Sequence, residues 1–226
     1  MIRVLIPARA GSKGIKNKNM VRVGGKPMIY YSINEAKKIF NKNQIFVSSD
    51  SDETLNYASD LGVIGIKRPK NISNDLSTSA EVVMHFIDHQ KLNASLDTKI
   101  IYLQPTSPLR TSRHIKEAVD LFHEKNANCL VSVSKSREYP QKAFVLNDGF
   151  LEYFIKSDIR NESRQSLDVT FYPNGAIYIF SIAAFNKNNE IPQDKITPYI
   201  MEKLDSIDID DMIDLEQAER VINARK

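Results

Sequence analysis

Residues 6–19 hold the densest group of side chains that could bind a phosphate. Cationic residues stand there among small ones: Arg9, Lys13, Lys16 and Lys18. Gly11 and Gly14 let the backbone approach a ligand closely, and exposed amide N–H groups add to the cationic charge, which together suits a triphosphate. The glycine spacing matches neither a Walker A loop nor the G-x-G-x-x-G fingerprint. A solvated basic surface turn is the alternative interpretation.

Two carboxylates near the C-terminus could share a divalent cation. Residues 206–210 alternate polar and apolar side chains, which predicts a strand with Asp208 and Asp210 on one face. Mg²⁺ prefers one or two carboxylates together with substrate phosphates. Helix capping by Asp210 or Asp211 is the alternative, and capping by Asp211 is compatible with metal binding by the other two.

The histidines and the cysteine suggest no second reactive centre. His85 and His89 share a helix face, but no Glu follows His85, so the zinc motif H-E-x-x-H is absent. His114 and His123 are expected on a helix surface. The single cysteine, Cys129, excludes an internal disulfide, fits a reducing compartment, and is predicted to be a buried small residue.

Bulk properties indicate one globular domain spanning residues 1–226. The chain is 42% hydrophobic and 26% charged, which makes disorder an unfavourable interpretation. The net charge of +3 is too small to imply nucleic acid or an anionic membrane. No apolar run approaches the ~20 residues of a membrane span, and the first residues lead into a strand pattern without a signal peptide. We therefore expect a cytoplasmic protein.

Apolar runs alternate with helical patterns along most of the chain. Strands are predicted at 2–6, 44–48, 63–66, 99–103, 129–133 and 176–180. Helices are predicted at 28–40, 53–61, 77–90, 112–125 and 211–226. This alternation predicts an α/β fold with an open, mostly parallel sheet and helices on both faces. The ligand site is then expected beyond the carboxyl ends of the strands, where the first loop, residues 49–52 and residues 104–110 would meet.

The pattern is looser between about 134 and 200. Residues 144–154 predict a hairpin with Asp148-Gly149 as its turn. Residues 156–168 are polar, and we expect them to form an excursion from the sheet.

The chain resembles the acylneuraminate cytidylyltransferases, the CMP-sialic acid synthetases, over nearly its whole length. Five segments carry the resemblance in the family's order: residues 7–19, 68–79, 104–110, 173–179 and 205–210. The characteristic sequences are Pro7-Ala8-Arg9, Ser12-Lys13-Gly14, Lys18-Asn19, Arg68-Pro69, Gln104 to Arg110, Pro173-Asn174-Gly175 and Asp205 to Asp210. Each motif alone is weak, but their shared order makes the resemblance specific.

The resemblance implies nucleotidyl transfer from CTP to an acidic nine-carbon sugar, aided by Mg²⁺ or Mn²⁺. The implied catalytic residues are Arg9, Lys13, Asp208 and Asp210, the last two as metal ligands. The implied nucleotide-binding residues are Ala8, Arg9, Ser12, Lys13, Asn19, Arg68 and Ser79. The implied sugar-binding residues are Gln104, Lys142, Arg164 and Tyr178. The resemblance also implies a homodimer, with a dimerisation and sugar-binding insertion at about 134–200.

Two departures from the family bear on the sugar. Tyr172 stands where sialate-activating members commonly carry Arg, and Ile191-Pro192 replaces an aromatic pair that packs on the sugar across the dimer. A related acid such as legionaminate or pseudaminate therefore remains an option beside N-acetylneuraminate. A cytidylyltransferase for 3-deoxy-manno-octulosonate and a non-catalytic nucleotide-binding regulator are the alternative functions. Retention of Asp208 and Asp210 argues against the regulator, because binding a base needs no metal pair.

Overall fold

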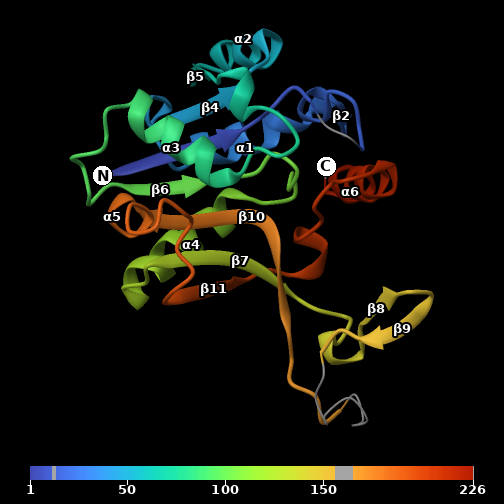
Figure 1. Cartoon of the computed structure of the whole chain (residues 1–226). Helices are drawn as coiled ribbons and strands as arrows, with labels where there is room; N and C mark the ends of the chain where they lie inside the picture. Colours follow the sequence, from blue (N-terminus) through green and yellow to red (C-terminus); the bar gives the residue numbers. More distant parts are fainter. Residues whose placement is uncertain (12–13, 156–164, 226) are drawn as a thin grey trace.

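The computed structural model describes residues 1–11, 14–155 and 165–225, and its centre is a seven-stranded sheet (Figure 1). The strand order is β11-β7-β10-β6-β1-β4-β5. The strands are β1 (Ile2–Pro7), β4 (Ile45–Ser49), β5 (Ile64–Lys67), β6 (Lys99–Tyr102), β7 (Cys129–Lys135), β10 (Phe171–Ser181) and β11 (Ile196–Ile200). Only β10 runs antiparallel to its neighbours in this sheet. The predicted mostly parallel sheet is confirmed.

Helices cover both faces of the sheet because the strands alternate buried side chains between them. On β1, Val4 and Ile6 belong to one hydrophobic cluster and Leu5 to the opposite one. The first cluster packs against α1 (Met28–Lys37), α2 (Asp52–Asp60) and α4 (Ser112–Lys125). The second packs against α3 (Ser79–His89) and α5 (Ile182–Phe185). A third cluster seats α6 (Met212–Ala224) against residues near the N-terminus. We call the sheet and these helices the body.

Helix starts follow the capping signals in the sequence. The Thr78 hydroxyl accepts from the amide of Glu81, whose carboxylate accepts in return from the amide of Thr78. Asp211 caps α6 by accepting from the amides of Ile213 and Asp214. Capping by Asp211 was predicted, and both α3 and α6 begin where local chemistry specifies.

The structure corrects two expectations about strands. Residues 206–210 form no strand but an irregular segment, whose Ile209 amide donates to the Thr106 carbonyl at 2.8 Å. The strand β11, which contains Pro198, was not predicted from the sequence. Proline has no backbone N–H to donate to a neighbouring strand, so a proline argues against a strand. It is tolerated here because β11 lies at the sheet edge.

A hairpin projects away from the body (Figure 1). It pairs β8 (Phe144–Asn147) with β9 (Phe150–Tyr153), and Asp148 and Gly149 both have positive φ, of 49° and 84°. This is the conformation that a two-residue hairpin turn requires, so the predicted hairpin is confirmed. We call residues 136–155 and 165–170 the arm. Residues 156–164, where an excursion was expected, lie outside the described residues.

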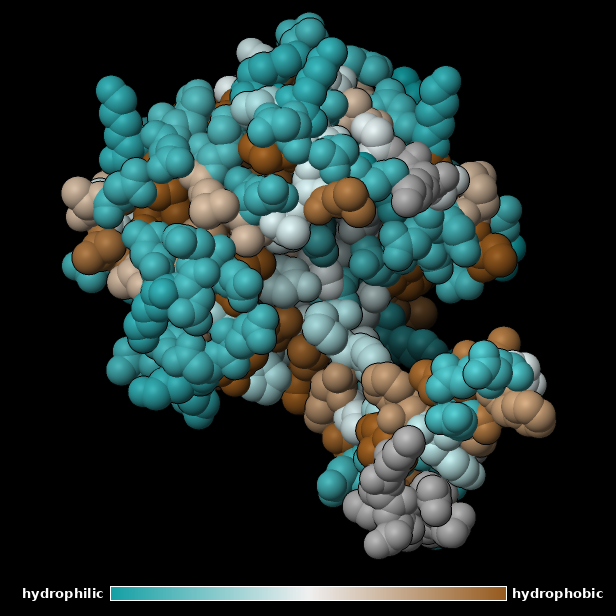
Figure 2. All heavy atoms as spheres, in the orientation of Figure 1, coloured by the Kyte–Doolittle hydropathy of each residue, from teal (hydrophilic) through white to brown (hydrophobic). Residues whose placement is uncertain are grey.

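The arm exposes large apolar side chains that the body would bury. Leu146, Phe150, Leu151 and Phe154 are each exposed by 65–76%. Figure 2 shows apolar side chains gathered on the projecting part of the molecule. In the described part of the chain, no helix has the length and apolar character needed to cross a membrane.

Candidate active site

A cavity of about 510 Å³ opens where β1 and β6 end, at the carboxyl edge of the sheet. The residues that line it come from the first loop, the start of α3, the end of β6 and the segment 206–210; among them are Arg9, Asn19, Arg68, Ser79, Gln104, Asp208 and Asp210. The sheet therefore brings together groups that lie far apart in the sequence, at the edge where the site was expected.

The first loop is tied to the body at several points. The amide of buried Ala8 donates to the Ser48 carbonyl, and the amide of Ala10 donates to Asp50 at 2.8 Å. The side-chain amide of Asn19, which is 8% exposed, donates to the Arg9 carbonyl at 2.8 Å. These bonds hold the backbone around Arg9 open toward the cavity. Ser12 and Lys13 lie outside the described residues.

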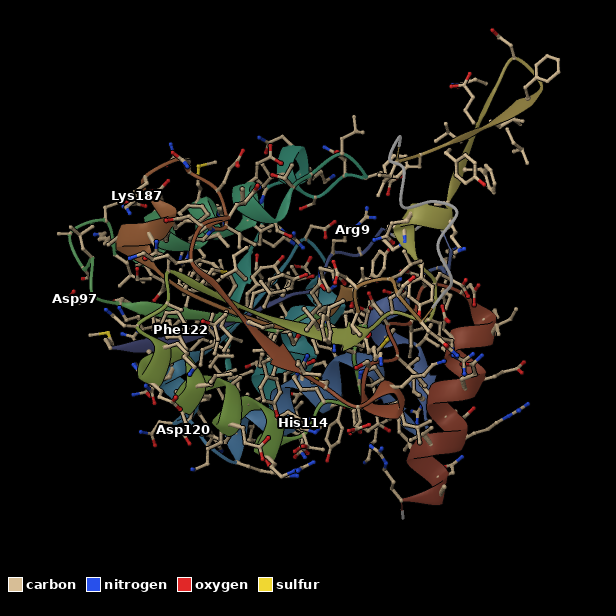
Figure 3. All side chains as sticks on the ribbon, turned by 90° about the horizontal axis from the view of Figure 1, so that it is seen from below. Arg9, Asp97, His114, Asp120, Phe122 and Lys187 are labelled. Atoms are coloured by element: carbon tan, nitrogen blue, oxygen red, sulfur yellow. The ribbon has the colours of Figure 1, made fainter. Side chains whose placement is uncertain are left out.

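Arg9 faces the cavity as a partly exposed cation. Its guanidinium pairs with Asp75 at 2.7 Å, and the two side chains are 32% and 39% exposed. In Figure 3, Arg9 lies on the side of the body from which the arm projects, and His114 lies on the opposite side. A guanidinium held this way can exchange a carboxylate for a phosphate, since both oxyanions match its donor geometry. Lys16 is exposed and does not line the cavity.

One end of the cavity is built from buried polar groups. Arg68 is only 4% exposed, and its burial lowers the pKa of the guanidinium. It donates to the Ser48 carbonyl at 3.3 Å, and its Nε has no partner among the described residues. The Tyr102 hydroxyl donates to Ser79, and burial raises the pKa of Tyr102 to about 12, so it stays protonated. Arg68 is thus a buried donor at the cavity and not a surface charge.

The other end carries the two aspartates. Burial raises the pKa of the Asp208 carboxyl. A hydrogen bond from the Thr106 side chain lowers this pKa, and the nearby charge of Asp210 raises it. Its Oδ1 is buried with no hydrogen-bond partner among the described residues. Asp210 is exposed by 80% at its side chain and pairs with Lys18 at 2.8 Å. Lys18, 14% exposed at its side chain, also donates to the Ile209 carbonyl. Lys18 of the first loop therefore contacts the acidic segment.

Two glycines let these segments approach each other. A Cβ on Gly14 would lie 2.3 Å from the Asp210 carbonyl oxygen, closer than any side chain permits. Gly175 has φ +73°, and a Cβ there would lie 2.5 Å from Gln104 Oε1 and 3.1 Å from Asp208 Oδ2. Because Gly14 and Gly175 have no side chain, the first loop and β10 can lie directly against the aspartates.

The predicted sugar-binding residues are spread more widely. Gln104 lines the cavity. Tyr178 packs edge-on against Tyr102 and does not line it, with ring centroids 6.2 Å apart. Lys142 lies on the arm, in the short helix η4 (Pro140–Lys142). Arg164 lies outside the described residues.

Comparison with known proteins decides the family. A family described as cytidylyltransferase matches residues 3–225. The chain belongs to this family. Over 91% of its length it is 34% identical to an N-acylneuraminate cytidylyltransferase of Streptococcus agalactiae. It is 30% identical over 95% of its length to a pseudaminic acid cytidylyltransferase of Campylobacter jejuni, of which it covers 93%.

The relatives of this chain differ in length. The chain spans about half, 49%, of the streptococcal protein and 51% of an N-acylneuraminate cytidylyltransferase of Escherichia coli that is 33% identical over 96% of the chain. The fold matches a solved CMP:2-keto-3-deoxy-manno-octonic acid synthetase complexed with CTP, with a TM-score of 0.73 at 15% identity over 100% of this chain and 99% of that one. At that identity the likeness establishes the α/β fold alone.

The cavity is also supported by Arg110, to which the sequence assigned no role. Arg110 is 1% exposed and donates to the carbonyls of Gln104 and Ala176 and to the Ser32 hydroxyl. Arg110 lies in the quoted motif 104–110, but its partners are visible only in the fold. It ties the end of β6 to β10.

Two smaller expectations have different outcomes. Cys129 is buried as predicted, and its burial raises the pKa of the thiol to about 12. His114 is not on the surface: it is 4% exposed, and its Nδ1 accepts from the Thr111 amide. The structure therefore uses His114 to start α4. Among the described residues, no group of three or more His, Cys, Asp or Glu side chains could hold a metal.

Proposed function

We propose that this chain transfers the CMP group of CTP to an acidic nine-carbon 2-keto sugar and releases pyrophosphate. The observation that carries the proposal is the lining of one cavity, which combines the buried donor Arg68 with the carboxylates of Asp208 and Asp210. The first loop, rich in cations and glycine, contributes Arg9 and Lys18 to the same cavity. A nucleoside triphosphate has matching parts: a base that needs hydrogen-bond partners, and phosphates that need positive charge.

The base end suits cytosine. The Arg68 guanidinium could donate to the O2 and N3 edge of the base, where its unpaired Nε offers an additional donor. A backbone carbonyl or hydroxyl near Ser79 would accept from the exocyclic amine. Burial of these groups makes a mismatched base costly, since it leaves a polar group without a partner.

The aspartates suit Mg²⁺ or Mn²⁺. Asp208 Oδ1 is a buried carboxylate oxygen without a partner among the described residues, which is the donor a hard cation requires. Asp210 would complete the pair once its ion pair with Lys18 is broken. When bound, the ion would supply positive charge at the phosphates and at the sugar hydroxyl.

The chain's own residues would then orient the reaction. Arg9, with Ser12 and Lys13 of the same loop, grips the phosphates so that the α-phosphorus faces the sugar. Asn19 keeps the backbone at Arg9 in place through its bond to the Arg9 carbonyl. The sugar hydroxyl attacks the α-phosphorus and loses its proton, and pyrophosphate leaves.

The sugar-binding half is proposed to need a second copy of the chain. Lys142 lies on the arm and outside the cavity of its own chain. The exposed apolar side chains of the arm, such as Leu146 and Phe150, would be covered in a homodimer, with residues in about 134–200 forming the dimerisation and sugar-binding region. The arm of one copy could then bring Lys142 and Arg164 to the cavity of the other.

The sugar itself is proposed to differ from N-acetylneuraminate. Tyr172 is 50% exposed on β10, and Ile191 packs partly against the second hydrophobic cluster. The aliphatic pair Ile191-Pro192, half-buried and buried within the single chain, would favour a less polar 9-deoxy acid of the legionaminate or pseudaminate type. Activation of 3-deoxy-manno-octulosonate is the weaker candidate, because the first loop has Lys13 where such enzymes usually have Arg.

Pyrophosphate release tests the proposal. The chain would be incubated with CTP, Mg²⁺ and each of N-acetylneuraminate, legionaminate, pseudaminate and 3-deoxy-manno-octulosonate. We expect release with at least one nine-carbon acid and little with the eight-carbon acid. Release with the eight-carbon acid alone would favour the weaker candidate. CTP binding without release from any acid would favour the non-catalytic regulator.

A further inference from the structure

The segment 206–210 is positioned without a strand ladder. On its C-terminal side, the Ile209 amide donates to the Thr106 carbonyl, and Lys18 donates to the Ile209 carbonyl at 2.7 Å. These bonds fix the backbone after Asp208. What fixes the backbone before Asp208 is Ser206, whose hydroxyl contacts a buried amide side chain.

That amide belongs to Asn174, which is 4% exposed and precedes Gly175 on β10. Its Oδ1 accepts from the Ser132 hydroxyl at 2.6 Å and from the Ala176 backbone amide at 3.2 Å. A backbone N–H can only donate, so the atom that faces Ala176 must be the oxygen. The Nδ2 group is therefore the one that donates to Ser206, at 2.9 Å.

The hydrogen bonds form a chain with one direction. The Ile177 amide donates to Ser132, Ser132 donates to Asn174, Asn174 donates to Ser206, and Ser206 donates to the Glu202 carbonyl at 2.9 Å. Each hydroxyl has a single proton, and each uses it on the next member. An acceptor in place of the Asn174 Nδ2 would face a Ser206 oxygen whose proton is already engaged.

We propose that Asn174 is a positioning residue for Asp208, an inference that rests on the proposed metal-dependent function. Asn174 holds Ser206, two residues before Asp208, while its neighbour Gly175 sets how closely β10 approaches the Asp208 carboxylate. The bulge of β10 between Pro173 and Tyr178 thereby fixes where the unpaired Oδ1 of Asp208 points. The residue touches the segment that carries the ligand and not the ligand atom itself.

The substitution Asn174→Asp tests this, because position and charge predict opposite results. An added carboxylate near Asp208 would tighten divalent-ion binding if charge alone mattered. If Asn174 acts through Ser206, the same substitution weakens binding, on the order of 10-fold for a group outside the ligand set. Binding is measured without turnover, as the dissociation constant of Mn²⁺ from the loss of its free-ion electron paramagnetic resonance signal.

Three further measurements complete the test. In turnover assays, Asn174→Asp should raise the Mg²⁺ concentration for half-maximal activity and lower kcat, with less than a twofold change in KM for CTP. Ser206→Ala removes the acceptor of the same bond and should act in the same direction, about threefold. Asn56→Asp makes the same chemical change at an exposed position of α2 and should change nothing.

Wild-type or tighter Mn²⁺ affinity in Asn174→Asp would overturn the inference, as would a variant whose only defect is a higher KM for CTP. Should Asn174→Asp fail to fold, wild-type Mn²⁺ affinity in Ser206→Ala would overturn it equally. Absence of turnover in the wild-type chain would instead contradict the proposed function, since the Mn²⁺ titration does not depend on activity.

Discussion

The body and the arm of this chain place their polar and apolar groups in opposite ways. The cavity of the body is lined by polar side chains such as Arg68, which is 4% exposed, and Asn19, which is 8% exposed. The arm presents Leu146 and Phe150 at 71% and 76% exposure (Figure 2). Buried polar groups are stable only with partners, and exposed apolar groups are stabilised by being covered.

The contrast separates two halves of the proposed reaction. In the proposed reaction, the body would supply the base and phosphate contacts from one chain. The arm carries Lys142, which does not line the cavity of the body. We therefore expect changes in the body to affect nucleotide and metal use, and changes in the arm to affect assembly and sugar use.

The largest expected effect is at the aspartates of the body. Asp208→Asn keeps the shape of the side chain but removes the charge, so kcat should fall on the order of 10²–10³-fold, and more Mg²⁺ should be needed. Asp210→Asn should act in the same direction. Asp60→Asn, an exposed aspartate at the end of α2, is the matched control. Wild-type turnover of both active-site variants at ordinary Mg²⁺ would remove the metal assignment.

Nucleotide choice is expected to be the next largest effect. Uracil places an acceptor where cytosine has a donor, and the buried end of the cavity would leave one group unpaired at about 1–3 kcal/mol. This corresponds to roughly 5–150-fold in kcat/KM for CTP over UTP. Steady-state kinetics with both nucleotides give the ratio. Equal values would mean that Arg68 and Ser79 do not read the base.

The arm should respond differently from the body. Leu146→Asp places a charge opposite Leu151 on the hairpin. Loss of an apolar anchor from an interface typically costs about 1–2 kcal/mol, so we expect the dimer dissociation constant to rise roughly 5–30-fold. Sedimentation measures assembly, and we expect sugar turnover to fall while CTP affinity stays within twofold. Leu96→Asp, at 49% exposure outside the arm, is the control. An intact dimer with normal turnover in Leu146→Asp would break the proposed division of labour.

The smallest expected effect concerns the sugar. The aliphatic pair Ile191-Pro192 should favour a methyl-bearing 9-deoxy acid, and each buried methyl contributes about 0.8 kcal/mol, so the preference is several-fold. It is measured as kcat/KM for legionaminate against N-acetylneuraminate. A tenfold or larger preference for N-acetylneuraminate would show that Tyr172 and the pair do not have this meaning.

Local patterns predicted the parts of the site that local chemistry determines. The caps of α3 and α6, by Thr78 and Asp211, follow from side chains within a few residues of each helix start. Both aspartates line the cavity, although residues 206–210 are not a strand. The pairing of Asp208 with Asp210 was therefore predicted from a strand that does not form.

Partners distant in sequence could not be predicted. The Asn174 side chain joins Ser132 and Ser206, which lie 42 and 32 residues away. Arg110 and His114 look like polar surface residues in the sequence, but the fold places backbone carbonyls around Arg110 and the Thr111 amide beside His114. Their burial depends on how strands and helices pack, which no local pattern specifies.

The most direct test of the central claim is a phosphorus NMR spectrum of the chain incubated with CTP, Mg²⁺ and a nine-carbon 2-keto acid. The account predicts that the three CTP resonances are replaced by a single phosphodiester resonance and by pyrophosphate, in equal molar amounts. No change should occur without the sugar, and little with Asp208→Asn. Formation of CMP and pyrophosphate with no phosphodiester, or unchanged CTP with every nine-carbon acid, would contradict it.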